Sequence, residues 1–262
     1  MAHVPFWDSA APAARKGSIP PGFPALTHVP FWDSAARGAV ASPGDSAIMA
    51  SPRGAMNMKL LLINCYREQS GDKIAGYRDW LRAGAEAAGI VIEPMEIGDD
   101  RIEPDMGTAA IVSGSQKMVG DNEAGTALLE FLAGWRRPLL GICFGHQALA
   151  RAFGATVRRD DTKHLGAGEV RAGAAAGLFA GFPPAFPMHE SHEEIVVRDA
   201  ALEREFHVLA VSGAGLVEAI VHRRRPLYGV QFHPERSGEL GVRLLVNFLR
   251  IAQHEAANYR DA

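Results

Sequence analysis

Hydrophobic and polar positions follow no regular order until about residue 58. Residues 1–57 are rich in Pro, Ala, Gly and Ser and show neither the period of a strand nor that of a helix. They contain a perfect nine-residue repeat at 3–11 and 28–36, and two copies are too few to bury a core. The repeat is either a docking motif anchored by Phe and Trp or part of a duplicated leader that precedes the true start. We expect a disordered leader over 1–57.

From Met58 onward, apolar runs alternate with helical periodicity. Short apolar runs typical of buried strands occupy 59–64, 90–93, 109–113 and 139–143. Apolar residues at helical spacing predict helices over 73–88 and 126–135, and a third helix that follows residue 143. Strands that alternate with helices predict a parallel sheet with right-handed crossovers.

After Gly154 the pattern changes to short β-like runs, at 155–158, 169–172, 195–198, 208–212, 216–222 and 228–232. These runs predict a mixed or antiparallel region that packs against the parallel sheet. A closing helix is expected from Ser237 or Gly238 to about His254, with Ser237 as its N-cap.

Composition and charge say little about the fold, but they restrict the classes of function. The chain has 262 residues, a formal net charge of -3 and 47% hydrophobic residues. It has no long Lys/Arg block, so binding of nucleic acid or of a membrane surface gains no support. We expect the basic stretch His222–Arg225 to form a solvated turn rather than a phosphate site. No apolar run approaches the about 18 residues of a membrane span. Cys65 and Cys143 are therefore expected to be free thiols in a reducing, cytoplasmic compartment.

The most informative stretch is 138–150, where a buried strand runs directly into a helix with Cys143 at the turn. Gly141 and Gly145 flank the cysteine, as a sharp strand-to-helix turn requires small neighbours. Such a turn presents its side chain at the carboxyl edge of the sheet. The helix start offers unpaired N–H groups and positive potential, which stabilise a thiolate or an oxyanion. The pattern predicts that Cys143 is a nucleophile.

A thiol of ordinary pKa needs a base beside it, and the segment 228–235 supplies one. An apolar strand ends there in His-Pro-Glu. His233 can act as the base because imidazole titrates near neutral pH. Glu235 can accept the other ring N–H and so fix the tautomer. The two segments together predict a triad of Cys143, His233 and Glu235.

Both segments resemble a known family. Gly-Ile-Cys-Phe-Gly-His-Gln and Gly-Val-Gln-Phe-His-Pro-Glu are similar to the nucleophile and His-Pro-Glu motifs of class I glutamine amidotransferases, and the resemblance covers about residues 58–251. Within the family, the chain is similar to the amidotransferase domain of GMP synthase and to γ-glutamyl peptidases. The expected fold is α/β, a flavodoxin-like three-layer sandwich with a central, mainly parallel sheet and an additional small mixed or antiparallel β region. The domain is expected to span 58–254, with a short tail at 255–262.

The resemblance implies hydrolysis of the glutamine side-chain amide through a thioester on Cys143, without a cofactor. By the same resemblance, Gln147 contacts the bound glutamine and the N–H of Phe144 is one oxyanion donor. The second donor is expected to be the N–H of Ser115, in a loop where the family tends to carry Ser-Gly-Gly-Pro. Here that loop reads Ser-Gly-Ser-Gln, with Gly114 as a substrate-binding position.

The segment 189–194 resembles the family's Ser-His-Gly-Asp segment, which holds the amino-acid end of the substrate. Ser191 and His192 fit that pattern, whereas Glu193 replaces the Gly. Two His and three acidic residues in this short segment also raise the question of a metal. Because the spacing offers no clear third ligand, no metal is expected.

Three functional classes remain open. In the first, the chain supplies ammonia to a separate synthetase partner. In the second, it is a stand-alone hydrolase of γ-glutamyl peptides. In the third, it is a non-catalytic regulatory module, which fits less well with three reacting residues. An α/β-hydrolase esterase is disfavoured because its acid usually precedes the His in the chain, whereas Glu235 follows His233.

Overall fold

The computed structural model describes residues 57–67, 71–103, 107–174 and 176–258. The expectations for the leader, apart from Asn57, and for residues 259–262 lie outside the described part of the chain. The strands are β1 (Met58–Asn64), β2 (Ile92–Gly98), β3 (Ala109–Val112), β4 (Leu139–Ile142), β5 (Val157–Ala172), β6 (Ala185–Val196), β7 (Phe206–Ser212), β8 (Val217–His222) and β9 (Leu227–Val230). The α-helices are α1 (Gly71–Ala88), α2 (Thr126–Gly134), α3 (Phe144–Ala152), α4 (Ala200–Glu205) and α5 (Gly238–Asn258), with short 3-10 helices η1 (Gly177–Phe179) and η2 (Pro234–Arg236).

These strands all belong to one sheet, in the order β2-β1-β3-β4-β9-β8-β7-β5-β6. The pairs from β2 to β9 are parallel, and those from β9 to β6 are antiparallel. The expected α/β class and mainly parallel first half are therefore present. The antiparallel strands, however, do not form a separate region packed on the sheet. They continue it, because β9 pairs with β4 along one edge and with β8 along the other.

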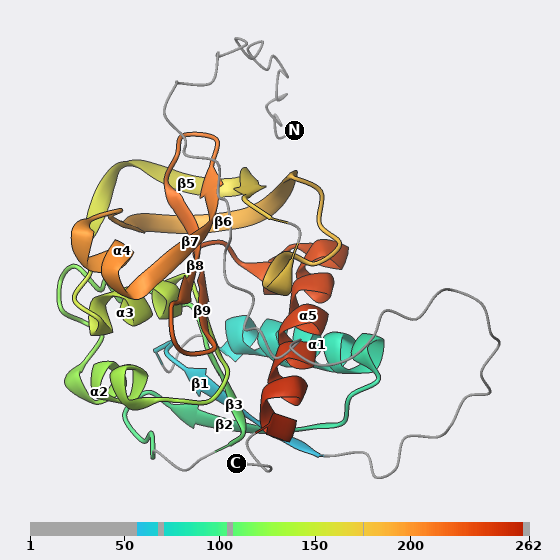
Figure 1. The fold of residues 1–262 in the computed structure, drawn as a ribbon. Helices are drawn as coiled ribbons and strands as arrows, with labels where there is room; N and C mark the ends of the chain where they lie inside the picture. The colour runs from blue at the N-terminus through green and yellow to red at the C-terminus, as the bar shows by residue number, and fades with distance from the viewer. Residues whose placement is uncertain (1–56, 68–70, 104–106, 175, 259–262) are drawn as a thin grey trace, which may run out of the picture. The chain divides into compact units, whose positions relative to one another are not determined.

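Helices cover both faces of the parallel half, with α1 and α5 on one side and α2 and α3 on the other (Figure 1). Strand β1 shows why its sequence is a continuous apolar run. Leu60 and Leu62 pack into the cluster under α1 and α5, whereas Leu61 and Ile63 pack into the cluster under α2 and α3. A strand buried on both faces has no polar side to alternate with.

Several boundaries differ from expectation where the apolar pattern is weak. Strand β2 runs from Ile92 to Gly98 rather than over 90–93, and it contains Pro94, which is tolerated because β2 lies at the sheet edge. The runs predicted at 155–158 and 169–172 are parts of one 16-residue strand, β5. Its register shifts between Arg159 and His164, where residues 160–163 lie opposite the single residue Glu193 of β6.

Helix α5 begins at Gly238, but the side chain of Ser237 does not cap it as expected. The Ser237 hydroxyl donates to the carbonyl of His233 (2.7 Å) and accepts from the N–H of His189 (3.0 Å). It therefore ties two segments together instead of serving a helix end. None of the helices in the described residues is long and apolar enough to cross a membrane.

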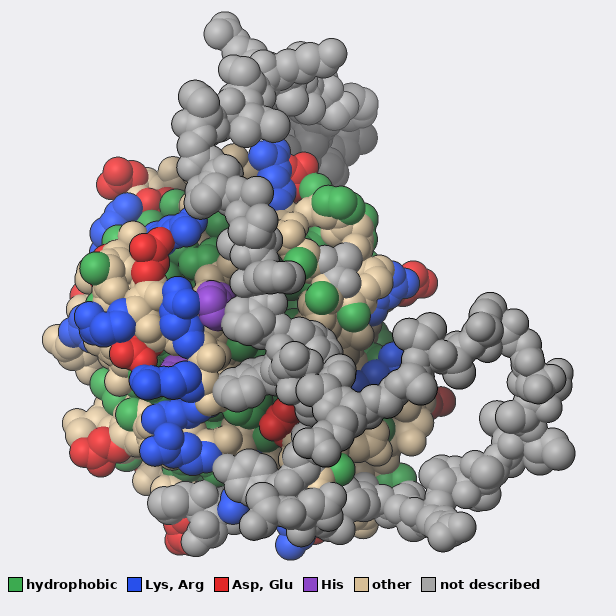
Figure 2. Space-filling view, viewed as in Figure 1, with side chains coloured by type: hydrophobic (Ala, Val, Ile, Leu, Met, Phe, Trp, Pro, Cys, Tyr) green, Lys and Arg blue, Asp and Glu red, His purple; other side chains and the backbone are tan. Residues whose placement is uncertain are grey.

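The turn between β8 and β9 contains only the arginines of the basic stretch, because His222 is the buried last residue of β8 and is not solvated as expected. In Figure 2, Lys and Arg side chains gather on the side of the visible face where α2, α3 and α4 lie in Figure 1. Arg223 and Arg224 are exposed, as expected of a solvated turn. Arg225 instead donates to the carbonyls of Ala133 (2.6 Å) and Trp135 (3.5 Å) at the end of α2. A cation there complements the negative end of a helix.

Candidate active site

Cys143 stands between the last residue of β4 and the first of α3, in a conformation that side chains rarely adopt. Its φ is 50° and its ψ is -101°, in the positive-φ region that favours glycine. The N–H of Cys143 donates to the carbonyl of Val230 on β9 (2.8 Å), and the residue is 5% exposed. The strained turn predicted from the sequence is therefore present, with the sulfur at the carboxyl end of the parallel strands.

The two flanking glycines are required by close backbone approach. A Cβ at Gly141 would lie 2.5 Å from the carbonyl oxygen of Gly145, and one at Gly145 would lie 2.5 Å from that of Val112. Real Cβ atoms essentially never come so near to backbone. The spacing Gly-x-Cys-x-Gly thus reflects how tightly α3 packs against β3 and β4.

His233 follows β9, which is the parallel neighbour of β4. Its Nδ1 lies 2.7 Å from Oε1 of Glu235, and both side chains are at least 95% buried. Burial lowers the pKa of His233, but the Cys143 sulfur, hydrogen-bonded to the ring, and the Glu235 carboxyl group outweigh it and raise that pKa to about 10. The site therefore favours a protonated His233 ring between Cys143 and Glu235. The three residues predicted as a triad lie together.

Backbone contacts fix the imidazole from the side of β6. The N–H of His233 donates to the carbonyl of His189 (2.7 Å), while the His233 carbonyl accepts from the hydroxyl of Ser237. The sulfur of Cys143 lies 3.9 Å from the carbonyl of Ser191. Strand β6 therefore contacts both the thiol and the base through main-chain groups.

A residue to which the sequence analysis gave no role, Gln231, also contacts the sulfur. Its side-chain amide donates to Sγ of Cys143 (3.7 Å), and its carbonyl oxygen accepts from Nε2 of Gln147 (3.2 Å). Gln147 also donates to the carbonyl of Glu194 (2.8 Å). The signal was available, because Gln231 lies two residues before His233 and alternate residues of an extended segment face the same side. The predicted substrate contact, Gln147, thus reaches the sulfur through Gln231.

The loop after β3 lies against His233. The N–H of Gly114 donates to the Tyr77 hydroxyl (2.8 Å). A Cβ at Gly114 would lie 2.9 Å from Cε1 of His233 and 2.8 Å from the Tyr66 hydroxyl. Ser115, where the family tends to carry Gly, turns its hydroxyl away to the carbonyl of Cys65 (2.7 Å). The loop therefore accommodates a side chain at 115 without placing it against the imidazole.

The carboxylate of Glu194 holds the next part of that loop. It accepts from the N–H groups of Val119 (2.8 Å) and Gly120 (3.0 Å). Glu193, which replaces a family Gly, faces outward and pairs with Lys163 (2.6 Å). Its substitution therefore leaves the interior of the site unchanged.

His192 lies deeper than a substrate-contacting residue is expected to lie. The residue is 6% exposed, and its Nδ1 lies 3.0 Å from the carbonyl of Glu194. Burial, with a smaller contribution from His164, lowers the pKa of His192 to about 4. Its ring stacks on that of His164. The structure therefore groups His192 with His164 and Glu190.

Phe144, the predicted oxyanion donor, is the first residue of α3, and its side chain is buried in the core.

The grouping of His192 with His164 and Glu190 corrects the argument that the segment 189–194 lacks a third metal ligand. His164 and His192 are directly opposed in the register of β5 and β6. With Glu190 they form a group whose ligand atoms lie within 4.8 Å of one another. The sequence could not show this, because His164 comes long before the segment and pairing alone brings it there.

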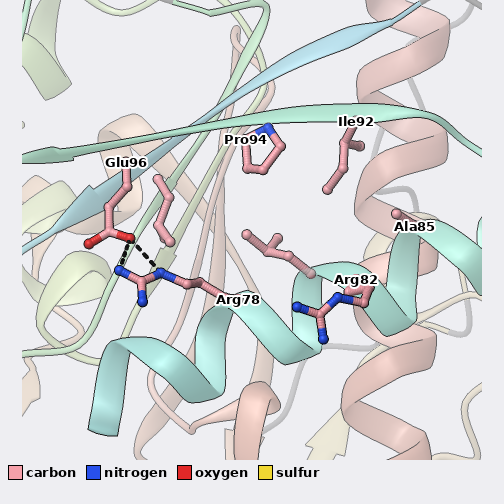
Figure 3. Close-up of a pocket in the computed structure, with 8 residues that line it drawn as sticks. Arg78, Arg82, Ala85, Ile92, Pro94 and Glu96 are labelled. Atoms are coloured by element: carbon pink, nitrogen blue, oxygen red, sulfur yellow. Dashed lines mark hydrogen bonds and ion pairs between the residues drawn. The ribbon is translucent and has the colours of Figure 1, made fainter. Parts of the chain in front are cut away.

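A hollow of about 540 Å³ lies elsewhere, between α1 and β2 (Figure 3). Apolar side chains such as Leu81 and Ile92 line it, and Arg78 at its rim pairs with Glu96 (2.7 Å). None of the predicted site residues lines this hollow. The reactive groups lie at the carboxyl ends of β4 and β9 instead.

A glycine-flanked cysteine at the head of a helix, with a histidine just beyond the end of the neighbouring strand, is the arrangement of a cysteine nucleophile beside its base. The chain belongs to the class I glutamine amidotransferase family, because residues 76–252 match the family described as glutamine amidotransferase class-I. The resemblance inferred from the two motifs is thereby confirmed.

Among its relatives is the glutamine-hydrolyzing GMP synthase subunit of Methanococcus aeolicus, 35% identical over 132 residues, which are 50% of this chain and 69% of the relative. The corresponding protein of Pyrococcus furiosus is 38% identical over 125 residues, 47% of this chain and 65% of the relative. The matched segment thus spans about two thirds of these relatives. A solved structure described as a GMP synthase subunit from Thermoplasma acidophilum covers 79% of this chain and 97% of its own with a TM-score of 0.65. At 24% identity, that likeness shows the fold alone.

Proposed function

We propose that this protein hydrolyses the side-chain amide of glutamine through a covalent intermediate on Cys143. The observation that carries the proposal is the buried chain of contacts from Cys143 to His233 to Glu235, with the His233–Glu235 distance at 2.7 Å. The arrangement supplies a nucleophile, a proton carrier and an orienting acid in one line. Family membership adds the substrate class.

The reaction begins when the Cys143 thiolate attacks the amide carbon. The N–H groups of Phe144 and Ser115 are the proposed donors to the resulting oxyanion, since the first N–H groups of a helix have no intrahelical partner. The His233 imidazolium gives its proton to the leaving nitrogen, and ammonia departs. Water then attacks the γ-glutamyl thioester, His233 accepts a proton from that water, and glutamate is released with the thiolate restored. One glutamine and one water thus yield one glutamate and one ammonia.

The remaining site residues are proposed to bind substrate. Gly114 leaves room beside His233, and Ser191 presents its backbone next to the sulfur. Gln147 and His192 are proposed to support the residues that touch substrate, because both side chains already form hydrogen bonds to the backbone carbonyl of Glu194. Turning the amide of Gln147 toward a ligand requires the exchange of one of these bonds.

We further infer that the ammonia goes to a separate synthetase partner, because the similar proteins are named as glutamine-hydrolyzing subunits of GMP synthase. The domain is proposed to span 58–254. Its parallel half is proposed to be a flavodoxin-like three-layer sandwich, since helices pack on both faces of β1, β3 and β4.

The test measures ammonia and glutamate released from glutamine by the full chain and by its Cys143→Ala variant. We expect slow release by the wild type, stimulated by a GMP synthetase partner, and release by the variant at the uncatalysed background. A second assay offers γ-glutamyl dipeptides without a partner. Faster cleavage of these than of glutamine would favour a stand-alone γ-glutamyl hydrolase. Equal glutaminase activity in wild type and variant would refute both enzymatic functions.

A further inference from the structure

We propose that His164, Glu190 and His192 form a binding site for a divalent transition-metal ion of the zinc type. None of the three residues belongs to the triad, and His192 alone is shared with the residues proposed to support substrate binding; zinc binding is measured without any assay of glutamine hydrolysis. It lies where β5 and β6 run side by side (Figure 1). Two imidazoles and one carboxylate are a donor set that zinc uses with a fourth, open position.

The three ligands come together through strand pairing. His164 on β5 is opposite His192 on β6, and Gly166 is opposite Glu190. The missing side chain at Gly168 leaves the space that the Glu190 carboxylate fills, since a Cβ there would clash with that carboxylate. The candidate ligand atoms all lie within 4.8 Å of one another.

Each histidine would bind the metal through one ring nitrogen. Its other ring nitrogen faces an oxygen atom that can accept a hydrogen bond. Nε2 of His164 lies 2.9 Å from Oδ2 of Asp160, which leaves Nδ1 as the nitrogen that faces Glu190, at 3.7 Å. Asp160 belongs to the segment of β5 in which the register shifts, between Arg159 and His164. Pairing of a ligating imidazole with an outer carboxylate fixes its tautomer and orientation, as is usual at metal sites.

His192 supplies an independent sign of a missing ligand. Its Nδ1 is used by the carbonyl of Glu194, whereas its Nε2 is fully buried with no hydrogen-bond partner among the described residues. An unpaired nitrogen in a residue only 6% exposed is costly unless something binds it. A metal ion would satisfy it.

Metal binding requires a small movement of one ring. Zinc bonds of about 2.0 Å in tetrahedral geometry put neighbouring ligand atoms about 3.3 Å apart. His164 and Glu190 are already near that value at 3.7 Å. The two imidazoles stack with centroids 4.6 Å apart and an interplanar angle of 13°, and a metal must lie in the plane of each ring. Loading the site therefore turns the His192 ring out of the stack.

The site has a structural link to the triad. Glu190 and His192 enclose Ser191, whose carbonyl faces the sulfur of Cys143, and follow His189, whose carbonyl accepts from His233. A metal held by Glu190 and His192 would fix this part of β6. We therefore assign the metal a positioning role and no chemical step.

The experiment measures zinc binding by dialysis and metal analysis, using the full chain with Cys143→Ala to remove the competing thiolate. In that background, His164→Gln removes one proposed ligand and leaves the triad region intact. His207→Gln, a partly exposed histidine on β7, is the matched control. We expect one zinc per chain in the background and in the control, and at least about 10-fold weaker binding with His164→Gln.

A second variant, Glu190→Gln, guards against a folding defect, because it keeps the size and most hydrogen-bonding capacity of the side chain. It too is expected to weaken zinc binding at least about 10-fold, with melting in a chelator recorded for every variant. Zinc binding that requires Cys143, or that is equal in the His164→Gln and Glu190→Gln variants and the control, would overturn the site. Failure of the background protein to bind stoichiometric zinc would overturn it as well.

Discussion

The positive φ of Cys143 predicts an unusual response to glycine. A non-glycine residue in such a conformation carries about 1–3 kcal/mol of strain, which Cys143→Gly removes and Cys143→Ala keeps. Against this relief, glycine loses about 0.4–1 kcal/mol to the greater freedom of the unfolded chain and about 0.8 kcal/mol from the buried Cβ. The sum leaves the glycine variant about as stable as the alanine variant, or slightly more stable.

The control is Ala148→Gly, in the regular part of α3 at 0% exposure. No strain is relieved there, so the same two losses add to about 1.5 kcal/mol. The two alanine-to-glycine comparisons should therefore differ by about 2 kcal/mol, the middle of the strain range. For a domain of this size, that difference is about 4–8 °C in Tm.

The assay is urea unfolding and calorimetry of four proteins: wild type, Cys143→Ala, Cys143→Gly and Ala148→Gly. The first comparison is between the two Cys143 variants, since both lack the sulfur. The loss of stability from alanine to glycine is measured at position 143 and at position 148. If the two losses are equal, the turn at Cys143 stores no strain. The argument that the backbone is forced to present the sulfur would then fail.

Three further predictions concern the imidazole. Glu235→Gln should lower kcat by about 10²–10⁴-fold with little change in Tm, because an amide orients the ring in the wrong tautomer; a pH–rate profile measures this, and unchanged kcat would contradict it. Gly114→Ala should lower kcat by about 10²-fold, since the new Cβ would lie 2.9 Å from Cε1 of His233; steady-state kinetics checks this, with circular dichroism to verify folding. Cys143→Ala should lower the His233 pKa from about 10, as histidine NMR titration would detect. Because this folded-state pKa lies above the ordinary 6.5, the ring's contribution to stability is complete below pH 6.5 and is lost as the pH rises through about 10.

The parts of the structure that the sequence predicted are those encoded by local pattern. The strand-turn-helix around Cys143 needs Gly141 and Gly145, and their spacing is visible without coordinates. The His-Pro-Glu sequence that follows β9 is equally local. The contact between sulfur and imidazole was expected from the two motifs together and not from strand order, because the run 228–232 was assigned to the mixed or antiparallel region, whereas β9 lies parallel to β4.

What the sequence did not reveal depends on pairing between distant segments. Strand β5 has only two fully buried positions, Val157 and Val170, so it lacks the apolar alternation by which strands are recognised. The partnership of His164 with His192 follows from the register of β5 and β6. Gln231 was overlooked because its contact with Cys143 depends on the pairing of β9 with β4, although its place two residues before His233 was a usable signal.

The neighbouring positions of β4 and β9 have a consequence for how such a domain can diversify. Interstrand spacing in a sheet is nearly constant at about 4.8 Å, so the pairing of β4 with β9 brings the ends of these strands, and with them Cys143 and His233, close together whatever length of chain lies between. Segments inserted between the two strands, apart from the β6 residues His189 and Ser191 that contact His233 and Cys143, can lengthen, shorten or gain new side chains while the reacting atoms keep their geometry. Variation there would alter what approaches the sulfur, and from which partner, without requiring the chemistry to be reinvented.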